Sequence, residues 1–208
     1  MPGISLRDVN PEIIKSSWLA FIGCNVPALD AGGKPGKITL AADAASGWKT
    51  PDASENPNAF FLGATSKGWQ GQGQTQTSQE FCDEFTAPIA TTKDSESFIY
   101  EADLMSVLNE KILTTVYGLE ALHQVADAFQ HYRVPSNADS PEMSFLLLTR
   151  RLVSGTYKYA YLFAPTSKQT ASFGQGNYTR TESFKSKLRM EFQLYSAWGT
   201  THTIWYEE

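Results

Sequence analysis

The side chains of this 208-residue chain that could take part in catalysis or metal binding are few and widely spaced. The three histidines, His123, His131 and His202, lie far apart, and no cysteine or carboxylate completes a spacing typical of a metal site. The two cysteines, Cys24 and Cys82, form no CxxC motif, which favours separate thiols in a reducing compartment over a disulfide. We therefore expect no metal site and no bound cofactor.

Two glycine-containing segments match nucleotide-binding motifs only in part. In the segment GGKPGKI at residues 32–38, Ala31 replaces the first glycine of a P-loop and Ile38 replaces its Ser or Thr. The segment Gly71-Gln72-Gly73 lacks the third glycine of a dinucleotide fingerprint. The chain also contains no G-x-S-x-G elbow and no Cys–His signature. The sequence therefore predicts a surface turn at 32–38 and a protein that is not an enzyme.

Charged residues form two spans of opposite sign. Acidic residues dominate 80–103, and basic residues dominate 150–189. Two interpretations remain open: the spans are solvated faces of one monomer, or they join neighbouring copies head to tail. A glycosidase-type carboxylate pair within 80–103 is a third interpretation, and a charged outer face of a sheet is favoured over it. On the head-to-tail interpretation, the contact residues are Glu96, Glu101, Asp103, Lys185, Lys187 and Arg189.

Overall charge and hydropathy exclude several classes of protein. The formal net charge of −5 argues against a general nucleic-acid-binding protein, which would carry an excess of Lys and Arg. No apolar run approaches the roughly 20 residues that a helix needs to cross a bilayer. The N-terminal residues carry charges where a signal peptide would have its apolar region. These features predict a soluble protein that is made in the cytoplasm and has no membrane partner.

The clearest change of pattern lies at residues 97–118, where the alternation of a strand passes directly into helical spacing. Ser106 can cap the start of the helix, and Gly118 stands where a left-handed residue ends one. We therefore predict a helix over 106–117 that packs against a sheet. Its apolar stripe is Leu108, Ile112 and Val116.

The rest of the chain has the alternation and turn residues of a β protein. Residues 1–17 are expected to form an N-terminal arm, and 41–58 a long loop with Trp48 as its one large apolar side chain. Residues 119–133 allow a second helix, and 69–79 are a polar strand or a flexible segment. We predict one mainly β domain with one flanking helix, an antiparallel β-sandwich or barrel. Its other strands are expected at 18–22, 37–40, 144–153, 157–163, 184–194 and 202–206.

The order of three features carries a resemblance to a known family. The segment FLGATSKG at residues 61–68 follows a long early loop, and the acidic strand regions 80–89 and 96–104 run into the expected helix 106–117. Closing strands then follow at 144–149, 157–165 and 184–195. In this order and spacing, the chain resembles the tail tube (major tail) proteins of long-tailed bacteriophages, the siphoviruses.

The resemblance implies a structural virion protein whose copies assemble in the host cytoplasm into hexameric rings that stack into the tail tube. The tube would assemble around a tape-measure protein, meet tail terminator and tip proteins, and conduct DNA without binding it specifically. An acidic lumen would let DNA slide, because phosphate contacts are what make nucleic-acid binding strong. The arm at 1–17 and the loop at 41–58, with Trp48 as an anchor, would contact the next ring. Glu96, Glu101 and Asp103 would face the lumen or a neighbouring subunit.

A carbohydrate-binding β-sandwich is the alternative function. Such modules present exposed aromatic side chains to sugar rings. The candidates in this chain are Trp48, Trp69, Trp198 and Trp205.

Overall fold

The computed structural model describes residues 18–44, 46–80, 90–105, 109–122, 130–134, 141–171, 173 and 185–207, and for 74–80 and 90–96 it describes the backbone alone. The expected arm at 1–17 lies outside these residues. Strands dominate the described part, and every strand pair is antiparallel, which confirms the mainly β antiparallel fold.

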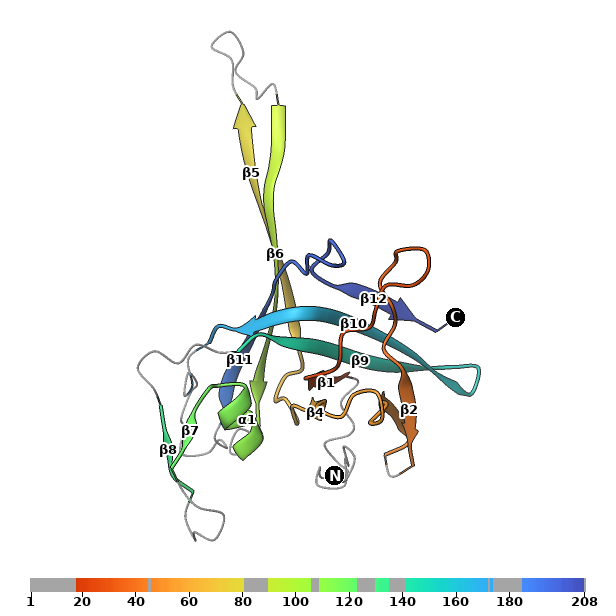
Figure 1. Cartoon of the computed structure of the whole chain (residues 1–208), viewed down its shortest axis with the longest axis vertical. Helices are drawn as coiled ribbons and strands as arrows, with labels where there is room; N and C mark the ends of the chain where they lie inside the picture. The colour runs from red at the N-terminus through yellow and green to blue at the C-terminus, as the bar shows by residue number, and fades with distance from the viewer. Residues whose placement is uncertain are drawn as a thin grey trace.

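One eight-stranded sheet forms the framework of the molecule (Figure 1). Its order is β4-β1-β9-β10-β11-β6-β5, and β12 also pairs with β10. The strands are β1 Trp18–Ile22, β4 Phe60–Phe61, β5 Gln70–Glu80, β6 Ala90–Leu104, β9 Met143–Val153, β10 Thr156–Gln169, β11 Ser186–Phe192 and β12 Thr203–Tyr206. Two small hairpins accompany the sheet: β2 Leu40–Asp43 with β3 Trp48–Pro51, and β7 Glu120–Ala121 with β8 Tyr132–Arg133.

The centre of the sheet is buried on both faces. Successive side chains of a strand point to opposite faces, so the apolar run of β9 supplies two separate cores. We call them the helix-side core and the hairpin-side core. The helix-side core includes Ile22, Ile112, Leu113, Val116, Phe145, Leu147 and Leu162, and the hairpin-side core includes Phe21, Trp48, Leu146, Leu148, Tyr159 and Tyr161.

The helix is shorter than the expected 106–117. Helix α1 spans Glu110–Thr115, and residues 106–108 lie outside the described part of the chain. Asn109, rather than Ser106, is the N-cap, because its side chain accepts a hydrogen bond from the backbone N–H of Lys111 at 2.9 Å. Gly118 has a φ of 64°, a left-handed conformation that turns the chain away after the helix.

The described residues of 119–133 do not form the second helix that the apolar spacing allowed. Strands β7 and β8 pair there instead, and the guanidinium of Arg133 contacts the carboxylate of Glu120. Residues 123–129 lie outside the described part. The left-handed Gly118 explains the correction, because it ends the helical path just before β7 begins.

Residues 41–58 form a folded hairpin and its flanks rather than an open loop. Strands β2 and β3 pair, with Gly47 at a φ of 67° in the turn between them. The hairpin is fastened to the sheet by two tyrosine hydroxyls: the N–H of Ile38 donates to Tyr161 at 2.8 Å, and the N–H of Lys49 donates to Tyr159 at 3.1 Å. The hairpin therefore covers one face of the sheet.

The C-terminal strand β12 is held at its end by Glu207. The Glu207 backbone N–H donates to the Tyr159 carbonyl at 2.8 Å, and its carboxylate accepts from the Tyr159 N–H at 3.1 Å. The same carboxylate lies 2.5 Å from the ammonium of Lys49. Burial alone would raise the pKa of Glu207, but the hydrogen bonds from Lys49 and Tyr159 and the charges of Lys49 and Lys158 outweigh it, so the pKa is lowered from 4.5.

This lowered pKa predicts a loss of stability in acid. The ionised carboxylate stabilises the fold above pH 4.5, and this contribution disappears as the pH falls through the lower pKa of the folded state. Glu207→Gln should therefore lower the free energy of unfolding at neutral pH by less than about 1 kcal/mol, and the melting temperature with it. The melting temperature of this variant should also fall less steeply as the pH is lowered. Thermal unfolding as a function of pH measures both effects. Glu120→Gln is the control, because it removes an ion pair outside the main sheet. In this variant the melting temperature should fall with pH as steeply as in the wild type.

Candidate assembly surface

Strands β6 and β11 bring four of the predicted contact residues together. The antiparallel register places Glu101 opposite Arg189 and Asp103 opposite Lys187. All four side chains alternate with buried ones, such as Ala102 and Leu188. The two strands therefore carry a charged face that points away from the helix-side core.

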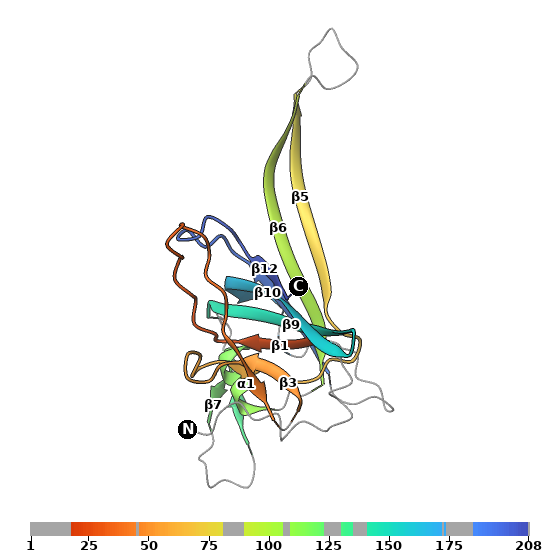
Figure 2. The same ribbon diagram turned by 90° about the vertical axis from the view of Figure 1, so that its right-hand side faces the viewer.

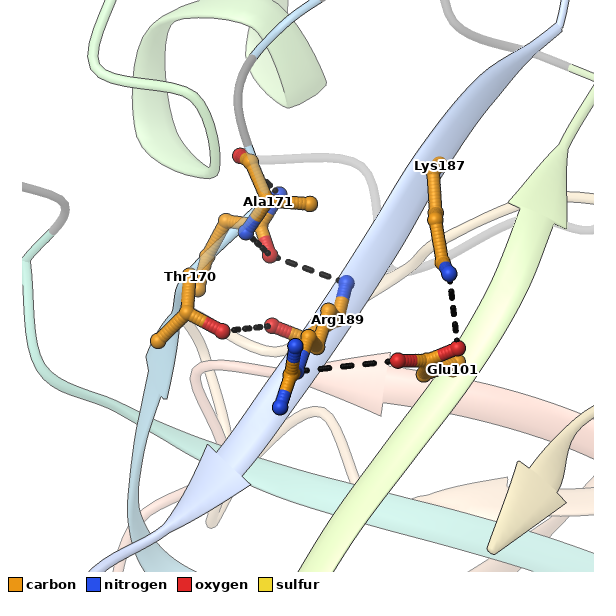
Figure 3. Close-up of polar contacts among 6 residues, drawn as sticks. Glu101, Thr170, Ala171, Lys187 and Arg189 are labelled. Carbon is orange, nitrogen blue, oxygen red and sulfur yellow. Dashed lines mark hydrogen bonds and ion pairs between the residues drawn. The ribbon is translucent and has the colours of Figure 1, made fainter. Parts of the chain in front are cut away.

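Glu101 is the centre of this face (Figure 3). Its carboxylate lies 2.8 Å from the ammonium of Lys187, and 3.6 Å separates its other oxygen from Nε of Arg189. The Glu101 side chain is 14% exposed, against 41% for Lys187. Exposed pairs of this kind contribute about 0.2–1 kcal/mol each, so they orient the side chains more than they stabilise the fold.

The backbone at Arg189 is fixed from its other side by β10 and the residues that follow it. The Arg189 N–H donates to the side-chain carbonyl of Gln169 at 2.9 Å, and the Thr170 N–H donates to the Arg189 carbonyl at 2.9 Å. Gln169 also accepts from the Ala171 N–H at 3.2 Å and donates to the Ala171 carbonyl at 3.0 Å. Figure 3 also shows the Thr170 hydroxyl, which donates to the Arg189 carbonyl at 3.5 Å. Together these contacts hold β11 between β10 and β6.

The acidic and basic spans also contact each other within one chain, an arrangement that neither interpretation of the sequence included. Glu101, Lys187 and Arg189 contact one another within a single chain. The spans lie far apart in sequence, but strand pairing makes them neighbours. Lys185 precedes β11 and is partly exposed, and the side chain of Glu96 lies outside the described residues.

A charge exchange tests the pairing within the chain. Lys187→Glu places a second carboxylate beside Glu101, and we expect the free energy of unfolding to fall by about 1 kcal/mol. Adding Glu101→Lys restores opposite charges and should recover most of the loss. Denaturant unfolding of the single and double variants measures the coupling. Lys34→Glu, in an exposed turn, is the control for a charge reversal without an ion-pair partner in this face. A double variant no more stable than Lys187→Glu alone would contradict the pairing.

Trp48 is not available as an anchor for a neighbouring ring, because it is part of the hairpin-side core. It is 2% exposed, and its ring packs edge-on against Tyr159 at a centroid distance of 6.2 Å. The guanidinium of Arg150 lies 4.1 Å from the Trp48 ring and 4.2 Å from that of Tyr157. Folding of the β2–β3 hairpin onto the sheet explains this burial.

The other three tryptophans named as candidates for sugar binding also pack within the chain. Trp69 packs against Phe145 at 5.1 Å, and Trp198 packs against Phe163 at 5.8 Å. Trp205, on β12, is partly buried against the hairpin-side core. None of these four side chains is an open aromatic platform on the surface.

The most prominent feature of the molecule is a two-stranded ribbon formed by β5 and β6. It projects well beyond the rest of the sheet in both views (Figures 1 and 2). Strand β11 pairs with β6 only over 99–104, so among the described residues the backbone of 90–98 has β5 as its sole neighbour. The eleven residues of β5 extend over about 35 Å.

Glycines and aromatic rings fasten the root of the ribbon to the body. Gly71 lies opposite Tyr100, and a Cβ added at Gly71 would approach the Tyr100 ring to 2.9 Å. Tyr100 in turn stacks on Phe192 at 5.3 Å, and Phe98 packs edge-on against His202 at 4.6 Å. The Gly71-Gln72-Gly73 segment therefore makes room for cross-strand rings.

Among the described residues, no strand pairs with the open side of β5 or with the outer part of β6 on the side away from β5, which leaves these edges available to another chain. β5 is the terminal strand of the sheet, and β6 has an open side beyond its pairing with β11. A two-stranded ribbon without a third strand is marginally stable in water, and open strand edges are templates for association. The sequence left 69–79 open between a polar strand and a flexible segment, and the structure shows strand β5 there. Sequence reasoning did not predict that β5 and β6 form a projecting ribbon.

Similarity to known proteins assigns the chain to no family. No protein-family model matches the chain, and no curated protein is significantly similar to it in sequence. Within the part of the chain that the structure describes, no three His, Cys, Asp or Glu residues are grouped as metal ligands. In the same residues, no helix has the length and apolarity required to cross a bilayer.

Proposed function

We propose that this chain is the self-assembling subunit of a tube, in which hexameric rings stack to form the tail tube of a long-tailed bacteriophage. The observation that carries the proposal is the β5–β6 ribbon, which extends beyond every other described strand. Along its outer half, none of those strands pairs with either edge. Identical neighbours in a ring would supply the missing strand partners, because each copy offers one open edge of β5 and one of β6.

The composition of the ribbon supports a water-filled lumen. Residues 74–80 and 90–96 contain Gln, Thr, Ser, Ala and charged residues, and no large apolar side chain. Association through this ribbon would therefore rely on main-chain hydrogen bonds rather than on apolar burial. A polar, mainly acidic lining suits a channel through which DNA passes without being held.

The partners and location follow from the same proposal. Copies of the chain are the main partners, and a tape-measure protein and the tail terminator and tip proteins would meet the inside and the ends of the tube. The assembled protein would reside in the virion tail. The acidic net charge of −5 agrees with DNA as a molecule in transit rather than a ligand.

Electron microscopy of the purified full-length protein tests the proposal. Negatively stained samples at rising protein concentration should show hollow rings and then stacked tubes, since assembly depends on concentration. Analytical ultracentrifugation of the same samples should show a shift from monomer to hexamer and larger species. A protein that stays monomeric at all concentrations would contradict the proposal.

A further inference from the structure

A cavity of about 430 Å³ lies between the main sheet and the β2–β3 layer, beside the C-terminal strand β12. Tyr159 and Tyr161 of β10 and Trp205 of β12 line the sheet side. Ile38 and Leu40 line the opposite side. The volume falls within the range of small-molecule sites, which combine apolar walls with a few polar groups. The proposed tube assembly does not use this cavity.

Three charged side chains line the cavity, Lys37, Lys49 and Glu207, and the last two form an ion pair. The ammonium of Lys49 lies 2.5 Å from the carboxylate of Glu207, and the two side chains are 38% and 39% exposed. The ammonium has three N–H donors, and this pair uses one of them. The pair therefore presents hydrogen-bond donors next to acceptors with no net charge of its own.

Two further polar groups, the Tyr161 hydroxyl and the Trp205 indole N–H, belong to the aromatic wall. The Tyr161 hydroxyl accepts from the Ile38 N–H at 2.8 Å, and burial raises the pKa of Tyr161 to about 12, so the hydroxyl keeps its hydrogen at neutral pH. The indole N–H of Trp205 is shielded from solvent and has no acceptor among the described residues.

We propose that this cavity binds one pyranose residue of a saccharide. A sugar hydroxyl both donates and accepts, so neighbouring hydroxyls can accept from Lys49 and donate to Glu207 at the same time. The apolar C–H face of the ring fits the wall formed by Tyr161 and Trp205.

Other ligand classes fit the cavity less well. A purely apolar ligand would desolvate Lys49 and Glu207 without replacing their hydrogen bonds to water. A small anion would have to compete with Glu207 for Lys49, and a small cation would meet the positive charges of Lys37 and Lys49. A neutral ring that carries adjacent hydroxyl groups satisfies both members of the pair.

Titration of the full-length protein with simple glycosides tests this site. The probes are the methyl pyranosides of glucose, galactose, mannose and N-acetylglucosamine, and the readout is the NMR signal of the Trp205 indole N–H. We expect at least one glycoside to bind with a millimolar or lower dissociation constant and to shift this signal. The measurement needs only the folded monomer, so its outcome is independent of tube formation.

Variants identify the cavity as the place of binding. Glu207→Gln and Lys49→Met should each weaken the affinity about tenfold, because each removes a hydrogen bond to a charged group. Trp205→Phe keeps an aromatic ring and so protects the fold. It should leave the melting temperature close to that of the wild type and weaken binding, which isothermal titration calorimetry measures because this variant lacks the indole N–H signal. Ile204→Ser is the matched control, because Ile204 is 66% exposed and alternates with Trp205 on the same strand.

Two results would overturn the proposal. One is the absence of binding by all four glycosides. The other is binding that Glu207→Gln and Lys49→Met leave unchanged, which would place the sugar elsewhere on the chain. Neither result bears on the tube, which the concentration-dependent electron microscopy tests separately.

Discussion

A variant without the outer ribbon should fold as a monomer and form neither rings nor tubes. Gln74 and Ser97 are cross-strand partners, so replacing residues 75–96 by Asn-Gly closes the hairpin with a two-residue turn that suits it. The deleted part pairs only with itself among the described residues, so we expect little change in the melting temperature. Self-association should be absent even about a hundredfold above the wild-type threshold concentration.

A proline variant separates loss of the ribbon from loss of folding. Thr77→Pro removes a main-chain donor from β5 while keeping the full length of the ribbon, and it should block assembly. Thr77→Ser keeps that donor and should assemble like the wild type. Light scattering and electron microscopy at matched concentrations measure both. If the proline and the shortened variants formed tubes as readily as the wild type, the ribbon would not be an assembly contact.

Phe145→Ala should destabilise the monomer far more than a charge reversal on the face of β6 and β11. Phe145 is fully buried at the centre of the helix-side core, and its ring lies 5.1 Å from Trp69, 5.7 Å from Phe192 and 6.3 Å from Tyr100. Removing the ring leaves a cavity among three other rings, and we expect the free energy of unfolding to fall by about 3–5 kcal/mol. Denaturant unfolding of the monomer measures this loss.

The position of Phe145 adds a second expected effect. Because Tyr100 and Phe192 fix the root of the ribbon, Phe145→Ala should also increase hydrogen exchange at the backbone amides of 98–101. Leu152→Ala on the same strand is the control, because Leu152 is 62% exposed and its loss should change stability by less than about 0.5 kcal/mol. Equal effects of the two substitutions would contradict the packing described for the helix-side core.

The sequence predicted those strands whose apolar residues alternate regularly or form one continuous run. The alternation over 184–194 predicted β11, in which Ser186, Leu188, Met190 and Phe192 are buried on one face. The apolar run at 144–153 likewise predicted β9. The pattern did not reveal that β9 is buried on both faces, since that depends on elements from the N-terminal part of the chain.

The candidate site depended on pairings that are distant in sequence. The charged spans were visible, but only the register of β6 and β11 shows that Glu101 lies beside Lys187 and Arg189. Trp48 was expected in a loop, and its burial depends on Tyr159, which is 111 positions further along the chain. The polar ribbon has no apolar face, so the usual signal of a strand was missing there.

The partnership of β1 with β9 also has a consequence for the synthesis of the protein. More than 120 positions separate β1 from its partners Phe145 to Thr149, so β1 is synthesised well before the strand it pairs with. Contacts between such distant segments slow folding, because a long loop must close before the pairing stabilises it. The central sheet therefore cannot form on a nascent chain that ends before β9.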